Sequence, residues 1–175
     1  GFIDLFATHL VEMPAKHVVE QFPALLHPLG INKMHLKLEI FYSKRHEKEV
    51  DILLAAYNIE SQDRIILIHP GNKNPLKRWK PEYFGRIADY IAKNKKAKII
   101  FTGSFDEEWL IKDIQTCMNY KSINFAGKTT APQLCALIGR ANLLISVDTA
   151  PVHIASAAGT PTIAIYGPTE TYYWG

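Results

Sequence analysis

The chain has 175 residues, of which 47% are hydrophobic and 21% charged, with a formal net charge of +3 and a pI near 8.8. This composition is typical of a soluble globular protein, and the length suits one ordinary domain plus an appendage. The mild positive charge suits a phosphate-bearing ligand but is too weak to indicate nucleic acid. No run of about 18 apolar residues occurs, so the sequence predicts no transmembrane segment.

The first 62 residues contain no glycine-rich turn and no converging set of polar side chains. Residues 16–31 have a helical pattern that Pro23 interrupts and Gly30 ends. Residues 35–41 alternate like an edge strand, and residues 46–59 form an amphipathic helical pattern. We therefore expect residues 1–62 to be a helical linker segment and the tail of a preceding domain.

From residue 65 onwards, short apolar runs alternate with segments of helical periodicity. The expected strands are 65–71, 98–103, 122–127, 143–147 and 161–167, and the expected helices are 80–94, 106–118, 130–141 and 150–159. This alternation indicates βαβ units, and strands that are apolar on both faces indicate a parallel sheet covered on both sides. The sequence therefore predicts an α/β domain over residues 63–175, with a Rossmann-like, doubly wound parallel sheet.

The residues that follow each predicted strand are candidates for a binding site, because ligands of such sheets bind beyond the carboxyl ends of the strands. After the first, second and fourth strands these candidates are small, polar or charged: Gly71, Asn72, Lys73, Lys77 and Arg78; Gly103, Glu107 and Glu108; and Asp148, Thr149 and Ala150. One edge of the sheet thus collects glycines, hydroxyls, carboxylates and basic residues.

The segment SVDTAPVH, residues 146–153, predicts an anion site at this edge. A helix that begins near Ala150 leaves its first N–H groups without intrahelical partners, and they carry the positive end of the helix dipole. Pro151 is tolerated there because its missing N–H would have had no partner. His153 falls in the first turn, on the side where an anion would lie.

Each of these features also has a purely structural explanation. Residues 148–149 could cap the helix and have no other role, and His153 could be a packed, hydrogen-bonded histidine. The basic run 73–80 could be a solvated loop, and residues 107–108 could serve the dipole of their helix alone. Their convergence on one edge favours a binding site.

Motifs of several other functional classes are missing or incomplete. AGKTT lacks the earlier glycine of a P-loop, no G-x-G-x-x-G follows a strand, and no G-x-S-x-G occurs. No D-x-D pair and no His/Cys/carboxylate cluster is present, so we expect no metal and no other cofactor. Cys117 and Cys135 lie far apart in helical segments, and we expect reduced thiols.

Several stretches resemble glycosyltransferase family 9, the ADP-heptose:lipopolysaccharide heptosyltransferases. They are HPG after the first strand, KRWKPEYF, TGSFDEE, the long run from NFAGKTT through SVDTAPVHIASAAGTP to IYGPTE, and the closing YWG. The resemblance covers residues 64–175 and is most specific over residues 146–169. The family usually has glycine at the position of Ala150. Residues 17–31 also resemble the family's segment that links its two halves.

The resemblance implies the GT-B fold, in which two Rossmann-like domains face each other across a cleft. This chain would hold the C-terminal, nucleotide-sugar-binding domain, truncated before its last helix. In the family, the lysine of a K-x-W motif and a D-T-x-P-x-H segment meet the diphosphate and the sugar, and a glutamate after a T-G turn holds the ribose. Carried over to this sequence, these residues are Lys77; Asp148, Thr149, Ala150 and His153; and Glu107, with Glu108 as the alternative.

The function that the resemblance implies is donor binding within an inverting, metal-independent glycosyltransferase. The whole enzyme would transfer heptose from ADP-heptose to the lipopolysaccharide inner core, on a lipid-linked saccharide acceptor. The acidic general base is expected on the missing N-terminal domain, so the catalytic residue is unknown and this chain alone is expected to be inactive. The expected location is the cytoplasm, with a peripheral position at the inner face of the inner membrane.

Two other interpretations stay open. The chain could belong to another GT-B glycosyltransferase or a sugar-nucleotide epimerase that uses a different nucleotide. It could also be a non-catalytic nucleotide-binding module. The exact donor sugar, the acceptor and the linkage position do not follow from the sequence.

Overall fold

The computed structural model describes residues 9–14, 17–33, 37–169 and 171, and the chain forms two compact units. One unit comprises residues 38–168. The other comprises residues 1–37 together with residues 169–175. The closing YWG motif lies outside the described residues.

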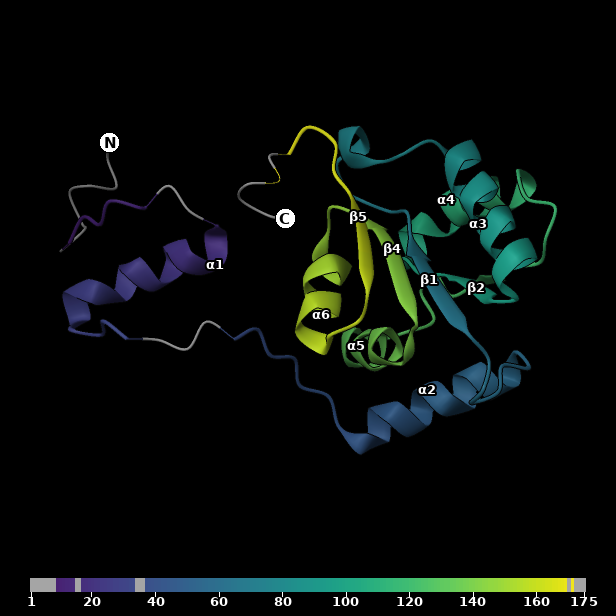
Figure 1. Ribbon diagram of the computed structural model, residues 1–175, viewed down its shortest axis with the longest axis horizontal. Coiled ribbons are helices and arrows are strands. Elements are labelled where there is room, and N and C mark those ends of the chain that lie inside the picture. Colours follow the sequence, from purple (N-terminus) through teal and green to yellow (C-terminus); the bar gives the residue numbers. More distant parts are fainter. Residues whose placement is uncertain (1–8, 15–16, 34–36, 170, 172–175) are drawn as a thin grey trace. The chain divides into compact units, whose positions relative to one another are not determined.

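The unit of residues 38–168 is built around one five-stranded parallel sheet (Figure 1). Its strands are β1 (Ile65–His69), β2 (Lys98–Phe101), β3 (Ile123–Asn124), β4 (Leu143–Val147) and β5 (Thr162–Ile165). They lie in the order β3-β2-β1-β4-β5. Helices α3 (Pro81–Lys95), α4 (Glu108–Thr116), α5 (Ala131–Arg140) and α6 (Ala150–Ala158) connect them. The prediction of a Rossmann-like α/β fold is confirmed.

The order of the strands explains where the helices lie. From β1 the chain runs outward to β3 through α3 and α4, returns through α5 to β4, and runs outward again through α6 to β5. Crossovers between parallel strands are right-handed, so reversing the direction of travel moves the connecting helix to the opposite face. Accordingly, α3 and α4 pack in one core cluster and α5 and α6 in the other.

The central strand explains why the sheet is stable. All five residues of β1 are buried, and the strand pairs with both β2 and β4. Its alternate side chains enter the two core clusters, with Ile65 and Leu67 on one face and Ile66 and Ile68 on the other. A strand apolar on both faces is what a sheet covered by helices on both sides requires.

Local sequence signals set the helix boundaries. Thr130 and Gln133 form the predicted capping box of α5, in which the Thr130 N–H donates to Gln133 Oε1 at 2.8 Å. Helix α6 starts at Ala150 with Pro151 in its first turn, as the sequence predicts. It ends at Gly159, whose φ of +73° is a left-handed conformation that glycine adopts without strain.

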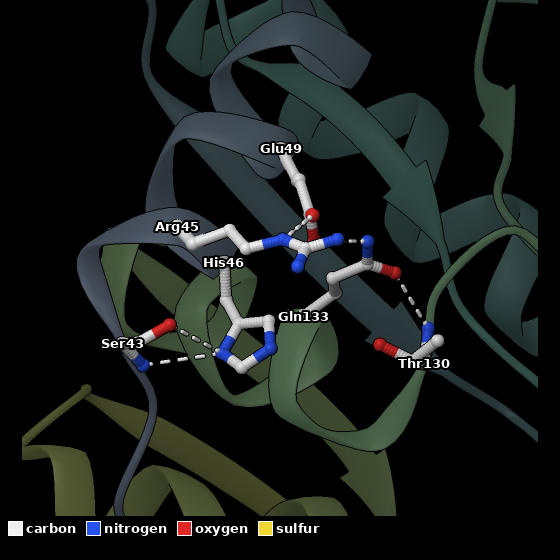
Figure 2. Close-up of polar contacts among 6 residues, drawn as sticks. All are labelled: Ser43, Arg45, His46, Glu49, Thr130 and Gln133. Carbon is white, nitrogen blue, oxygen red and sulfur yellow. Dashed lines mark hydrogen bonds and ion pairs between the residues drawn. The ribbon is translucent and has the colours of Figure 1, made fainter.

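Helix α2 (Lys44–Ala56) belongs to this unit, although the sequence analysis grouped it with the linker segment. Its Val50 and Leu54 are buried in the same core cluster as α5 and α6. Figure 2 shows the polar side of this packing: Gln133 Nε2 on α5 donates to Glu49 Oε2 at 2.9 Å. The compact unit therefore begins near residue 38, and the predicted domain boundary at residue 62 stays a prediction.

The prediction of an edge strand at residues 35–41 is wrong for residues 37–41, which are the part of this segment that the structure describes. Residues 37–41 form no strand, and residues 34–36 lie outside the described residues. The side chains of Leu38 and Phe41 are exposed, and among the described residues no strand of the sheet pairs with this segment. In contrast, the expected strand at 122–127 is present but shorter, with two residues in β3.

The face of the sheet over β4 and β5 opposite α6 carries an apolar groove. Its lining combines α3 with β4 and β5 and is mostly apolar, with Ile66, Trp79, Ile87, Tyr90, Ile91, Leu143, Ile145, Ile163 and Ile165. Arg64 and Asn142, which precede β1 and β4, also line it. The groove therefore extends to the amino ends of the strands, where ligands of such sheets do not usually bind.

In the other unit, the described residues form one short helical segment. Helix α1 (Val18–Gln21) passes into the 3₁₀ helix η2 (Phe22–Leu29) at the point where Pro23 interrupts the helical pattern. Gly30 ends it with φ of +79°. Across the described parts of both units, no helix has the length and apolar character needed to cross a bilayer.

Candidate functional site

The carboxyl ends of β1 and β4 lie side by side where the strand order reverses. His69 of β1 pairs with Ser146 of β4, and the two strands belong to oppositely directed halves of the sheet. The loops that leave these strands therefore diverge, and such a switch point is where doubly wound sheets bind ligands. The candidate residues predicted from the sequence lie in the loops around this point.

An ion pair joins the two sides of the switch point. Lys77 Nζ donates to Asp148 Oδ2 at 2.6 Å. The Asp148 side chain is 6% exposed and the Lys77 side chain 26% exposed, so the carboxylate is buried while the lysine is partly accessible. An ammonium group has three N–H donors, and this contact occupies one of them. Lys77 is thus held in place with donors left for an anion.

The loop that carries Lys77 is tied down through Asn72. The Asn72 side chain donates from Nδ2 to the carbonyl oxygen of Asp148 at 2.7 Å, and its Oδ1 accepts from the Asn74 N–H at 2.8 Å. Asn74 in turn accepts from the Leu76 N–H at 3.0 Å, which caps the 3₁₀ turn η3 (Pro75–Lys77). Lys77 therefore sits at the end of a turn that Asn72 ties to Asp148, the residue directly after β4.

Helix α6 presents its amino end at the same edge. Thr149 occupies the N-cap position in an extended conformation, but its side chain makes no capping hydrogen bond. Ala150 is exposed as the first helical residue, and His153 lies in the first turn and is half-buried. The first amides of the nine-residue helix carry about half a positive charge from the dipole. The purely capping role considered for Thr149 is not what its side chain does.

Glu107 lies between the ends of β1 and β2. Its Oε2 accepts from the Ser104 N–H at 2.8 Å and from Ser104 Oγ at 3.0 Å. A Cβ at Gly71 would collide with the Glu107 carboxylate, and a Cβ at Gly103 would come within 3.2 Å of Oε2. Both glycines are therefore needed for the carboxylate to reach the sheet edge.

Glu108 lies differently, although it is adjacent in the sequence. Its Oε1 is 3.1 Å from Lys112 Nζ, one turn further along α4. The pair is exposed, with 63% of the lysine and 42% of the glutamate side chain accessible. The geometry thus brings Glu107, and not Glu108, to the strand ends.

A buried histidine lies beneath Glu107. His69 is 8% exposed, and its Nδ1 is 2.9 Å from the hydroxyl of Thr102, which is 1% exposed. Burial lowers the pKa of His69 from its ordinary value of 6.5 to about 4, although the negative charge of Glu107 acts in the opposite direction. His69 is therefore neutral at physiological pH and serves the packing of β1 against β2.

The structure gathers most of the predicted residues at one edge but distributes them unevenly. Lys77, Asn72 and Asp148 are connected by hydrogen bonds, whereas Lys73 is exposed in the same loop and, within the described part of the chain, does not bond to them. Arg78 contacts Trp109, a residue that no motif in the sequence marked as part of the site.

The arrangement has the chemistry of an anion site beside a hydroxyl site. A positioned ammonium group and the positive end of the α6 dipole favour phosphate, and Ala150 offers an N–H there, although Pro151 has none and the Val152 N–H donates to the Thr149 carbonyl. A carboxylate at the neighbouring strand ends can accept hydrogen bonds from hydroxyl groups. A nucleoside diphosphate has both features. Among the described residues, no three His, Cys, Asp or Glu side chains gather as metal ligands.

Comparison with known proteins gives a consistent result. The family model described as glycosyltransferase family 9 (heptosyltransferase) matches residues 3–175. Lipopolysaccharide heptosyltransferase 3 of Escherichia coli (strain K12) is 32% identical over 169 residues, which cover 95% of this chain and 48% of that protein. The lipopolysaccharide core heptosyltransferase OpsX of Haemophilus influenzae is 31% identical, with 93% and 46% covered. The chain thus spans about half the length of these relatives.

Solved structures share the fold. The glycosyl transferase family 9 structure from Veillonella parvula DSM 2008 superimposes with a TM-score of 0.90 at 25% identity, covering 99% of this chain and 51% of that one. E. coli heptosyltransferase WaaC with ADP gives a TM-score of 0.66 at 18% identity, covering 97% and 52%. The predicted relation to the GT-B half is therefore supported at the level of fold.

The buried state of His69 predicts a specific pH dependence of stability. Its native pKa is depressed, so between about pH 6.5 and about pH 4 the unfolded chain binds a proton that the native state does not. Stability should therefore fall as the pH is lowered through this window, by about 2 to 3 kcal/mol from His69 alone. Urea unfolding at neutral pH and near about pH 4.5 measures the change.

The matched variant is His69→Gln, which can still hydrogen-bond with Thr102 but does not titrate. The other acidic groups are the same in both proteins, so the difference between the two pH profiles isolates His69. The variant should lose less stability on acidification than the wild type. Parallel pH profiles would show that His69 is not held neutral by burial.

Proposed function

This chain belongs to glycosyltransferase family 9, and from that premise we propose that it is the donor-binding half of a heptosyltransferase. The whole enzyme would transfer heptose, with inversion, from ADP-heptose to the inner core of lipopolysaccharide. The curated relatives support this substrate class, because those matched over most of this chain are named as lipopolysaccharide heptosyltransferases. The ADP named for the WaaC structure agrees with this choice of nucleotide.

The observation that carries the proposal is the ion pair at the switch point. Asp148 holds the Lys77 ammonium group beside the first turn of α6, so two sources of positive charge converge. The diphosphate of the donor would lie between them, with Lys77 as a point charge and with the Ala150 N–H and the α6 dipole on the other side. Thr149, Ala150 and His153 border this position, and Lys73 adds positive charge from the exposed part of the loop.

The ribose would lie against Glu107. A carboxylate with two oxygens can accept from both the 2′- and 3′-hydroxyl groups, and Ser104 fixes its orientation through two hydrogen bonds. The absence of a Cβ at Gly71 and Gly103 lets the carboxylate reach this position. Glu108 pairs with Lys112 instead and has a weaker claim to this role.

Transfer needs more than donor binding. The departing ADP would be stabilised by the fixed charge of Lys77 and the helix amides, without need for a divalent metal. An acceptor hydroxyl also needs a base in hydrogen-bond reach. Asp148 is already bonded to Lys77, so we assign the base and the lipid-linked acceptor to the other half of the full-length enzyme. This chain alone is then expected to bind donor without transferring sugar, and the full enzyme to act at the cytoplasmic face of the inner membrane.

The phosphate assignment predicts that Lys77→Ala weakens ADP binding more than adenosine binding. Loss of a charged hydrogen bond should lower ADP affinity roughly 10- to 100-fold, while adenosine, which lacks phosphates, should bind almost as before. Calorimetric titration of both ligands into the two proteins measures the difference. Equal losses for ADP and adenosine would contradict the assignment.

The matched control is Lys80→Ala, since Lys80 lies over the Tyr83 ring at 6.0 Å and has no contact with Asp148. It removes the same charge and should leave ADP affinity nearly unchanged. Because Lys77→Ala leaves a buried carboxylate without its cation, thermal unfolding is followed in parallel.

Metal-independent binding predicts that titrations of ADP with and without excess chelator give the same affinity. A large loss of affinity on chelation would contradict it.

The ribose assignment predicts that Glu107→Gln weakens ADP binding and that the effect depends on the ribose hydroxyls. Replacing a charged acceptor by a neutral one should cost roughly tenfold in affinity. With 2′,3′-dideoxy-ADP, wild type and variant should bind equally, because the ligand no longer donates to position 107. Competition against a fluorescent ADP analogue measures both ligands.

Glu108→Gln is the matched control for this experiment. It removes the same charge one residue away, from a side chain that faces Lys112, and should change ADP affinity little. A larger loss for Glu108→Gln than for Glu107→Gln would transfer the ribose role to Glu108. A Glu107→Gln loss that persists with the dideoxy ligand would exclude hydroxyl recognition by Glu107.

A further inference from the structure

The side chain of Arg78 connects two loops of the site. Its Nε donates to the carbonyl oxygen of Asn72 at 2.7 Å, within the loop that carries Lys77. Its guanidinium carbon lies 5.6 Å from the centre of the Trp109 ring, on the second residue of α4. This distance is within the range of a cation–π contact. One side chain thus spans from the loop after β1 to the helix that follows Glu107.

Both contacts depend on the shape of the guanidinium group. Its Nε–H bonds to the loop while its charged end lies over the indole ring. A lysine carries the same charge but cannot do both at once, because its ammonium group is a compact point charge on a flexible stem. Trp109 is 52% exposed, so burial alone does not explain its position beside Arg78.

Asn72 links Arg78 to the phosphate side of the site through two hydrogen bonds. Its carbonyl accepts from Arg78, and its side chain donates to the Asp148 carbonyl at 2.7 Å. Asp148 holds Lys77 at 2.6 Å. A continuous set of contacts therefore runs from Trp109 through Arg78, Asn72 and Asp148 to Lys77.

At the other end, Trp109 lies two residues after Glu107 in the chain. Glu107 closes the 3₁₀ turn η4 (Phe105–Glu107), and α4 begins directly after it. Fixing Trp109 against Arg78 therefore fixes the start of α4 relative to the loop of Lys77. The phosphate side and the ribose side of the site come from different strands, and Arg78 bridges them through its side chain.

We infer that Arg78 and Trp109 form a clamp that sets the spacing between Lys77 and Glu107, and that both are positioning residues. The inference rests on the proposed function, since the spacing matters only for a ligand that meets both groups. It gives Arg78 a role different from direct contact with the donor, which the sequence analysis expected.

The test compares ADP binding by Trp109→Leu, Arg78→Lys, the double variant and Trp109→Phe. Each of the first two should weaken ADP binding roughly fivefold, as expected for loss of one cation–π contact. The double variant should be no weaker than the weaker single variant, because both substitutions break the same contact. Trp109→Phe keeps an aromatic face and should bind ADP nearly as the wild type does.

A second readout separates positioning from general destabilisation. Adenosine engages only the ribose side, so its affinity should fall less than that of ADP in every clamp variant. Tyr83→Leu is the matched control, because it removes an exposed ring with Lys80 Nζ at 6.0 Å, and it should leave ADP affinity unchanged. Thermal unfolding identifies any variant that fails to fold. If Trp109→Leu or the double variant does not fold, ADP binding is compared between Arg78→Lys, which breaks the contact, and Trp109→Phe, which keeps it.

Three results would overturn the clamp. If Trp109→Leu binds ADP like the wild type while Arg78→Lys does not, Arg78 contacts the phosphates directly. If the single losses add in the double variant, the two residues act independently. Equal losses for ADP and adenosine would exclude a spacing role. The Lys77→Ala variant separates this failure from that of the proposed function: if it weakens ADP while the clamp variants do not, only the clamp is wrong.

Discussion

The ion pair between Lys77 and Asp148 lies where the strand order of the sheet reverses, and the other contacts of the site form around it. Taking a carboxylate out of water costs several kcal/mol unless a cation and hydrogen bonds compensate. A hydrophobic pair of similar size would serve stability as well. We therefore interpret the pair as functional: it keeps an ammonium group at the edge of the sheet, beside the amino end of α6.

The path of the backbone sets what can surround this ion pair. Because β1 and β4 start oppositely directed halves of the sheet, their loops diverge and leave space above the carboxyl ends. Gly71 and Gly103 keep part of that space free of Cβ atoms, and the Glu107 carboxylate enters it. Charge for a phosphate and an acceptor for hydroxyls thus come from different strands of one rigid sheet.

The sequence was sufficient for the fold and for the edge that carries the site, because apolar runs, capping boxes and strand-end residues are local signals. It could not separate Glu107 from Glu108, since only the positions of Ser104 and Lys112 distinguish them. The strand predicted for residues 37–41 is absent, because an alternating apolar pattern does not show whether a neighbouring strand is there to pair with. The Arg78–Trp109 contact joins residues 31 positions apart, and no local pattern marks such a pair.

A crystal structure of the chain with ADP tests the central claim most directly, which is that the switch point binds the diphosphate of the donor. The account predicts phosphate oxygens within hydrogen-bond distance of Lys77 Nζ and of the Ala150 N–H, with the ribose against Glu107. ADP bound elsewhere, for example in the apolar groove over β4 and β5, would contradict it. So would a diphosphate that lies at the switch point but makes no contact with Lys77.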